Sequence, residues 1–398
     1  AQFEIKQDLA FVTEGLKLRA MASVRTYVEN QNESSFTPFY YGASEVETPT
    51  GTTNELYQIQ EGTEFLNNAP TANNGNSNFY YEAVLEYNRT FSEKHEVGGL
   101  LVSYFQEALN TTGGGTFSSL PSRNLGISGR TSYSYDSRYF GEFNFGYNGS
   151  EKFAEENRFG FFPSIGMGWI ISNEPFFEKN VPSVNLLKLR YTYGLVGNDG
   201  ISSASDRFFY LSDVNLNNGG TGYTFGTNYN NNYNGFIINR YANESVTWEV
   251  ATKSNIGLEL GLFNKVNIQA DYFTENRRNI YMERQFIPET SGLTTVISSN
   301  IGEVKTKGLD LSIDYNHAFS GDFYITARGN FTYSTNEIII NGEPEFQNKN
   351  LSRIGYAVNQ QWGYIAERLF VDQEDINNSP EQFNGFSSTN AYLPGDIK

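Results

Sequence analysis

The sequence contains no cysteine, and only two of its 398 residues are histidines. The absence of cysteine excludes both a disulfide framework and a thiolate metal site, although it says little about the compartment. No run of about 18 apolar residues occurs either, so the chain contains no candidate transmembrane helix. Any membrane must therefore be crossed by elements other than helices.

Positive charge is also scarce, with 28 Lys and Arg residues against 45 Asp and Glu residues and a formal net charge of −17. Nucleic acid needs a basic surface that neutralises its phosphates, so this balance argues against nucleic acid as a partner. The acidic excess is typical of exposed loops that keep a protein soluble.

Signals of catalysis are missing as well. His95 and His317 lie in or beside expected tight turns, which is a poor setting for the histidine of a catalytic triad. The paired carboxylates at 155–156 and 374–375 are neighbours in loops, whereas glycosidases need two carboxyls facing one another across a cleft. The glycine run at 113–115 lacks the Lys and Ser or Thr of a phosphate-binding loop. We therefore predict that the protein is not an enzyme.

The sequence is rich instead in aromatic residues, which make up 16% of the chain and include 27 Tyr and 32 Phe. They recur in runs of about ten residues with alternating apolar positions, the length that a tilted strand needs to cross a bilayer. In one such run Tyr139, Phe143, Phe145 and Tyr147 share a face. Because side chains alternate across a strand with period two, these runs predict membrane-spanning β-strands.

The connections between the runs carry further information. About twelve strands and no helix before Asp372 are expected, with long polar loops at 29–77, 198–244 and 338–398. Short and long connections alternate, except that 172–185 is long where a short turn is expected. Outer-membrane barrels have short periplasmic turns and long extracellular loops. The pattern predicts an all-β, antiparallel transmembrane β-barrel, since a soluble sandwich or propeller gives no reason for such alternation.

On this interpretation, four aromatic residues of the central strands have a structural role. Phe143, Phe145, Phe161 and Trp169 are expected to face lipid or to belong to an aromatic girdle at the membrane surface. Function is expected in the loops instead.

The second long loop combines aromatic rings with many amides. Rings stack on sugar faces and amides bond to hydroxyl groups, so such a loop suits a glycan or a peptide. We predict substrate-binding roles for Tyr223, Phe225, Tyr229 and Tyr233, and for Trp362 near the extracellular mouth. A solvated loop, or one that packs against a partner protein, is the alternative interpretation.

Three aspartates could supply oxygen ligands for Ca²⁺ in an extracellular loop, namely Asp199, Asp206 and Asp213. Their spacing of seven residues does not match an EF-hand loop, and solvated loop acids are the simpler interpretation. We therefore predict no metal site and no cofactor, with structural Ca²⁺ in the extracellular loops kept as an alternative.

Six stretches resemble a known family and keep its order along most of the chain. They are LPSRNLGISGRTSYSYDSRYFGEFNFGYNGSEKFAEENRFGFFPSIGMGWIISNEPFF (120–177), LKLRYTYGLVGND (187–199), VTWEVATKSNIGLELGLF (246–263), DYFTENRRNIY (271–281), SNIGEVKTKGLDLSIDY (299–315) and WGYIAERLFVDQEDINNSP (362–380) with a final PGDIK. These stretches are similar to the barrel of the SusC/RagA-type TonB-dependent transporters of Bacteroidetes.

The resemblance implies a barrel of about 22 strands with an N-terminal plug. It further implies energy supplied by TonB through the plug, a SusD-like surface lipoprotein as a lid, and uptake of an oligosaccharide or a peptide. The location would be a Gram-negative, Bacteroidetes-type outer membrane, with lipid or lipopolysaccharide around the barrel.

No plug domain is found in residues 1–398, so we expect this stretch to be a partial barrel from the interior of a longer chain. A passive pore is one alternative to an energised importer. A barrel component of a larger outer-membrane surface assembly is another.

Overall fold

The computed structural model describes residues 1–110, 117, 120–201, 206–319, 321, 323–380 and 392–398. The chain forms two compact units, Ala1–Gly355 and Tyr356–Lys398. Within the described residues, no helix combines the length and the apolar character that a membrane span requires.

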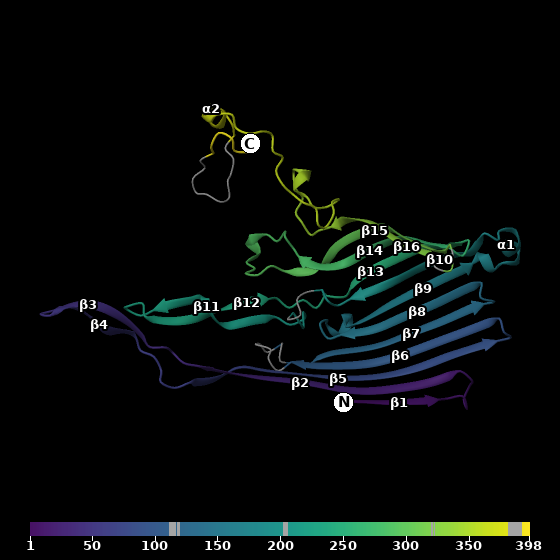
Figure 1. Cartoon of the computed structure of the whole chain (residues 1–398), viewed down its shortest axis with the longest axis horizontal. Helices are drawn as coiled ribbons and strands as arrows, with labels where there is room; N and C mark the ends of the chain where they lie inside the picture. Colours follow the sequence, from purple (N-terminus) through teal and green to yellow (C-terminus); the bar gives the residue numbers. More distant parts are fainter. Residues whose placement is uncertain (111–116, 118–119, 202–205, 320, 322, 381–391) are drawn as a thin grey trace. The chain divides into compact units, whose positions relative to one another are not determined.

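The first unit is built on one sheet of twelve antiparallel strands, in which every strand pairs with the next sheet strand along the chain (Figure 1). This confirms the predicted antiparallel sheet and its twelve strands. The strands are β1 (Gln2–Asp8), β2 (Leu16–Ser35), β5 (Asn67–Phe91), β6 (His95–Asn110), β7 (Ser122–Tyr135), β8 (Tyr139–Ser150), β9 (Phe159–Ile170), β10 (Val184–Asn198), β13 (Glu249–Leu262), β14 (Val266–Glu283), β15 (Ser298–Ala318) and β16 (Tyr324–Ile340).

Short and long connections lie at opposite ends of these strands, which we call the short-turn end and the long-loop end. At the short-turn end, three hairpins close with two consecutive residues of positive φ, for example Asp136 and Ser137 at 51° each. Such turns match the right-handed twist of the flanking strands, whereas ordinary turns would splay them. The local sequence therefore explains why this end is compact.

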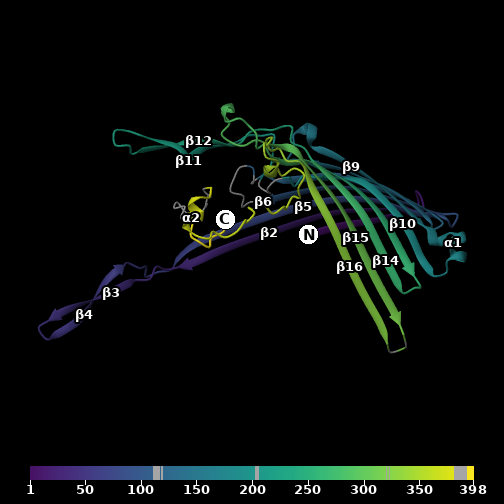
Figure 2. The same cartoon turned by 90° about the horizontal axis from the view of Figure 1, so that it is seen from above.

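The long loops contain structure that the sequence did not predict. The loop expected at 29–77 contains a separate hairpin of β3 (Tyr40–Thr48) and β4 (Gly51–Gln60). The loop expected at 198–244 contains another, formed by β11 (Asp213–Phe225) and β12 (Asn231–Arg240) (Figures 1 and 2). Both hairpins lack a buried apolar face, so no period-two pattern marks them in the sequence.

The expectation of no helix before Asp372 is wrong, because α1 (Pro175–Asn180) lies in the connection that broke the alternation of loop lengths. Proline at the first helical position presets φ and needs no hydrogen bond, which explains where α1 begins. The remaining short helical segments are η1 (Glu155–Asn157), η2 (Ile171–Asn173), η3 (Glu289–Ser291), η4 (Lys349–Leu351) and, in the second unit, α2 (Gln373–Asn377).

The register of the sheet separates an apolar face from a polar face. Phe143 of β8 lies opposite Ile165 of β9, and Tyr139 lies opposite Trp169, so these side chains share the apolar face. They are also exposed, with 42% of Phe143 accessible. Large apolar side chains exposed on one face of a membrane β-sheet are those that contact lipid. The structure thus places the predicted lipid-facing residues together.

Buried apolar side chains gather at the long-loop end. Phe153, Phe209, Val246 and Trp248 form a cluster in which Phe153 is fully buried and Val246 is 1% exposed. They come from the β8–β9, β10–β11 and β12–β13 connections. The cluster holds three loops to one another by apolar burial, so this end has a small core of its own.

Candidate functional site

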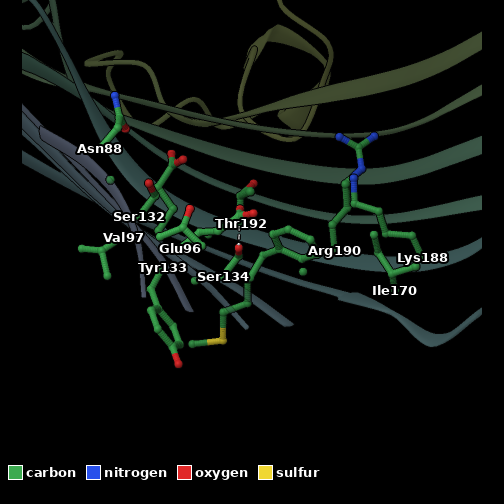
Figure 3. Close-up of a pocket in the computed structure, with 18 of the residues that line it drawn as sticks. Asn88, Glu96, Val97, Ser132, Tyr133, Ser134, Ile170, Lys188, Arg190 and Thr192 are labelled. Carbon is green, nitrogen blue, oxygen red and sulfur yellow. Dashed lines mark hydrogen bonds between the residues drawn. The ribbon is translucent and has the colours of Figure 1, made fainter. Parts of the chain in front are cut away.

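The polar face of the sheet is the first candidate site, since it faces away from the lipid. A hollow of about 670 Å³ lies on β5 to β10 towards the short-turn end. Figure 3 shows Tyr133 pointing to the apolar side while Ser132 and Arg190 point to the other. Ser134 donates a hydrogen bond of 2.9 Å to Glu96, so the polar groups of the hollow are partly joined to one another.

Small residues keep the hollow open. Gly98, Gly166 and Gly168 line it together with Ser132. A Cβ atom at Gly98 would lie 2.4 Å from the Ser132 hydroxyl oxygen, a distance that forces a neighbour to move. A larger residue at this position would displace the Ser132 side chain, so the glycine leaves free space above the sheet.

A ladder of ion pairs crosses the polar face at β10, β13 and β14. The guanidinium of Arg190 donates to both carboxylate oxygens of Asp271, at 2.8 and 2.7 Å. Lys188 and Arg190 also approach Glu259, at 3.2 and 3.4 Å. The two cations, Lys188 and Arg190, are thus balanced by two carboxylates on this part of the polar face. The arrangement suits a hydrated passage for polar solutes, and it contains no nucleophile paired with a base.

The structure brings three of the five predicted substrate-binding residues together. Tyr223 and Tyr233 are cross-strand partners in the β11–β12 hairpin. The Phe225 ring, two residues further along β11, contacts both, with ring centroids 5.3 Å from Tyr223 and 5.8 Å from Tyr233. Tyr229 lies in the turn of the same hairpin with a φ of 49° and is 76% exposed. The hairpin therefore presents an exposed aromatic cluster, and the substrate-binding role remains a prediction.

Two arginines fix the base of this hairpin. Arg207 is 7% exposed and donates to the carbonyl oxygens of Phe117, Leu120 and Pro121, and to the carboxylate of Glu151. One guanidinium therefore joins three separate loops.

The second arginine continues this network into the hairpin itself. Arg240, the last residue of β12, donates to the carbonyl oxygens of Arg207 and Phe208 at 2.7 and 3.4 Å. Its guanidinium lies 5.3 Å from the centre of the buried Phe209 ring. A planar guanidinium satisfies several carbonyl groups at once, which explains why arginine occupies both positions.

Trp362 belongs to the second unit, where its ring lies 4.9 Å from that of Tyr356. In the same unit, Asp375 accepts hydrogen bonds from both terminal nitrogens of Arg368 and from the amide of Val371. The Arg368 guanidinium, followed by that amide, lowers the pKa of Asp375 well below its ordinary value. Trp362 is thus placed in a different unit from the four hairpin residues.

The three aspartates considered for Ca²⁺ have different partners. Asp199 accepts from the Ser150 hydroxyl at 2.8 Å, Asp206 lies 3.7 Å from Arg240, and Asp213 accepts from Asn239 at 3.3 Å. Within the part of the chain that the structure describes, no group of three His, Cys, Asp or Glu side chains is arranged to hold a metal ion.

Sequence reasoning missed a buried carboxylate at the short-turn end. Glu174 is 6% exposed and accepts hydrogen bonds from Tyr139 at 2.5 Å, Arg138 at 2.8 Å and Trp169 at 3.1 Å. The Tyr139 bond, followed by the Trp169 bond, lowers the pKa of Glu174 although burial raises it. Glu174 therefore fastens the connection that contains α1 to the aromatic side chains of Tyr139 and Trp169. Its only signal in the sequence was the unexpected length of that connection.

No protein-family model matches the chain. The TonB-dependent receptor P39 of Formosa agariphila is 29% identical over 328 residues, which cover 76% of this chain and 30% of that protein. The TonB-dependent receptor SusC of Bacteroides thetaiotaomicron is 31% identical over 211 residues, which cover 53% of this chain and 20% of that protein. The solved RagAB peptide transporter superposes with a TM-score of 0.61 at 21% identity, over 89% of this chain and 39% of that one.

These similarities first define the class, an antiparallel β-barrel of the bacterial outer membrane. They then confirm the resemblance found in the sequence, to TonB-dependent transporters of the SusC/RagA type. The RagAB match at 21% identity shows the fold alone. The chain spans 30% of the P39 receptor and 20% of SusC. These curated relatives are receptors and not enzymes, which confirms the prediction of a non-enzymatic protein.

Proposed function

We propose that this chain is part of an outer-membrane importer that takes up an oligosaccharide or a peptide with energy supplied through TonB. The observation that carries the proposal is the division of the sheet into an apolar face and a polar face bearing balanced ion pairs, of which Arg190 with Asp271 is one. A wall of this kind separates lipid from water. The similarity to TonB-dependent receptors supports energised passage along the polar face.

The polar face of the sheet suits a solute that must pass along it without being tightly bound. Ion pairs that satisfy one another leave few unpaired charges to hold a passing ligand. The β11–β12 hairpin offers the opposite chemistry, with exposed rings and nine asparagines between residues 213 and 240. We assign capture of the nutrient to this hairpin and passage to the wall. Trp362 is a further capture residue in this proposal.

A SusD-like surface lipoprotein is the lid in this proposal, and TonB acts through a plug domain. The solved structures similar to this chain include the RagAB peptide importer in states named closed-closed and open-open. Those names support a lid that opens and closes over the barrel.

The proposal is tested by measuring uptake of labelled oligosaccharides and peptides in cells that carry or lack the full-length protein. Uptake that depends on the protein and stops when a protonophore collapses the proton-motive force is the expected result. Uptake that continues after the collapse would identify a passive pore instead. Loss of surface assembly without any effect on uptake would favour a component of a larger outer-membrane machine.

The lid is tested separately by purifying the full-length protein from outer membranes and identifying the proteins that accompany it. A surface lipoprotein in equal amount is expected. Recovery of other outer-membrane proteins in its place would contradict the proposed partner.

A further inference from the structure

A second cavity lies on the polar face at the long-loop end, far along the strands from the hollow of Figure 3. Its volume is about 850 Å³, within the range of pockets that hold small ligands. The ladder register builds its floor from one row of four strands, in which Arg25 of β2 faces Asn78, Asn78 faces Ala108, and Ala108 faces Ser122. The small Ala108 and Ser122 leave room above the sheet.

The next row along the strands continues the same surface. Tyr27 faces Asn76, and Asn76 faces Asn110. These side chains stand on the same face as Arg25, because positions two apart on a strand share a face. The floor of the cavity therefore offers one ring, three amides and one guanidinium.

Two cations from the loops complete the cavity, Lys152 from the β8–β9 connection and Arg207 from the β10–β11 connection. All three charged residues that line it are thus positive, although the whole chain carries a net charge of −17. The guanidinium of Arg25 has no hydrogen bond or ion pair with any described residue. Among the described residues, no carboxylate lines the cavity.

The two loop cations differ in how their charges are compensated. Lys152 donates at 2.9 Å to the carbonyl oxygen of Asp199, and no ion pair joins it to a described carboxylate. Arg207 pairs with Glu151, so its charge is compensated. Glu29, which does not line the cavity, accepts from the Tyr27 hydroxyl at 3.3 Å. The cavity therefore retains positive charge at Arg25 and Lys152.

We propose that this cavity binds an anionic oligosaccharide through its carboxylate or sulfate groups. Arg25 and Lys152 pair with the anionic groups, since charge-assisted hydrogen bonds to such oxygens are the strong ones. The amides of Asn76 and Asn78 both donate and accept, which matches sugar hydroxyls, and the Tyr27 ring supplies a stacking face. The inference rests on the proposed importer and narrows its substrate class.

The pairing of the floor strands limits how a peptide could bind. Extended peptides are commonly bound by adding a strand to a free sheet edge. At this cavity β5 and β6 are each paired on both sides, so a ligand that lies over Asn78 and Ala108 is held by side chains alone. β2 pairs with β1 only as far as Ser23, which leaves its outer edge free of described strands beside Arg25, so an acidic peptide is included among the probes of the test.

The test measures binding to the purified full-length protein by calorimetry, with tetragalacturonate, a sulfated tetrasaccharide, neutral maltotetraose and tetraglutamate as probes. One or both anionic sugars should bind, and the pair distinguishes carboxylate from sulfate as the recognised group. Arg25→Gln and Lys152→Gln should each weaken that binding about tenfold or more. Arg25→Lys should restore part of it, and added salt should weaken it.

Lys17→Gln is the matched control, because Lys17 stands on the same strand and the same face as Arg25 but at the short-turn end. It should leave the affinity unchanged. Equal binding of maltotetraose and the anionic sugars, tighter binding of tetraglutamate, or no effect of Arg25→Gln would overturn the proposal. Binding needs no energy supply, so binding that depends on Arg25 together with uptake that ignores a protonophore would leave this site standing while refuting energised import.

Discussion

The two hairpins at the long-loop end have the same secondary structure but opposite chemistry. The segment 36–66, which contains β3–β4, has five glutamates and no Lys or Arg. The segment 213–240, which contains β11–β12, has one acid and one base at its ends, with nine asparagines between them. The first hairpin is acidic, and the second is a neutral surface of amides and rings.

The hairpins also differ in how they are anchored. Thr37 and Thr63 close the base of β3–β4 with bonds of 2.8 and 3.0 Å within their own loop. Within the described part of the chain, no hydrogen bond joins that hairpin to another loop. The β11–β12 hairpin is tied through Arg240 to the loop that Arg207 fixes. A hairpin that is anchored by other loops of its own chain, such as β11–β12, suits ligand capture. A hairpin without such an anchor, such as β3–β4, suits contact with a protein partner that holds it in place.

The largest effect on hairpin stability is expected from removing Arg207, which anchors the base of β11–β12. Arg207→Ala leaves three carbonyl oxygens and the carboxylate of Glu151 without their donor in a buried site. Breaking a buried ion pair costs about 3–5 kcal/mol. Hydrogen exchange at Phe209 and along β12 should accelerate accordingly, while exchange in β3–β4 stays the same. Equal acceleration of hydrogen exchange in both hairpins would show that they do not differ in how they are anchored.

A second prediction uses one glycine from each hairpin. A Cβ at Gly235 would lie 2.2 Å from the backbone oxygen of Thr221, whereas a Cβ at Gly42 would lie 2.6 Å from the end of the Tyr57 ring. The backbone cannot move away but the exposed ring can. Gly235→Ala should therefore destabilise its hairpin by about 1–3 kcal/mol, and Gly42→Ala by much less. Amide hydrogen exchange within each hairpin measures both losses of stability, and a larger loss from Gly42→Ala would contradict this prediction.

A third prediction concerns the exposed rings. Tyr223→Ala with Phe225→Ala should weaken binding of the imported nutrient about tenfold, because the aromatic cluster is lost without change to the anchor. The matched pair Tyr41→Ala with Tyr57→Ala removes two rings from the acidic hairpin and should leave that affinity unchanged. Calorimetry on the full-length protein compares the two. An equal loss in both variants would assign capture to rings in general and not to the neutral hairpin.

The comparison also shows what could be predicted from the sequence. The twelve sheet strands were predictable since each carries a lipid-facing row of period two, such as the row that contains Phe143. The two hairpins were missed because both of their faces are exposed and no periodicity results. Helix α1 was missed because six residues are too short to show a helical period. Alternation thus predicts only the elements that have a buried or lipid-covered side.

The candidate site was predictable in part for a related reason. Tyr223, Phe225 and Tyr233 were chosen for their chemistry, and the register of the hairpin brings them together. The cavity of Arg25 and the loop network of Arg207 depend on residues far apart in the chain, which only the ladder register and the loop packing place side by side. No local pattern signals such contacts.

The smallest effect is expected on the acidic hairpin, where the charges of Glu45, Glu47 and Glu55 are solvated. Changing all three to Gln leaves the fold intact, because exposed charges contribute little to stability. Charges at the rim of an interface act mainly on the rate of association and its salt dependence. The variant should therefore associate with the lipoprotein lid several-fold more slowly at low salt, and at the same rate at high salt. Asp213→Asn in the neutral hairpin is the control and should change neither rate. A triple variant that binds the lid as fast as the unmodified protein at low salt would show that β3–β4 is solvated and not a docking surface.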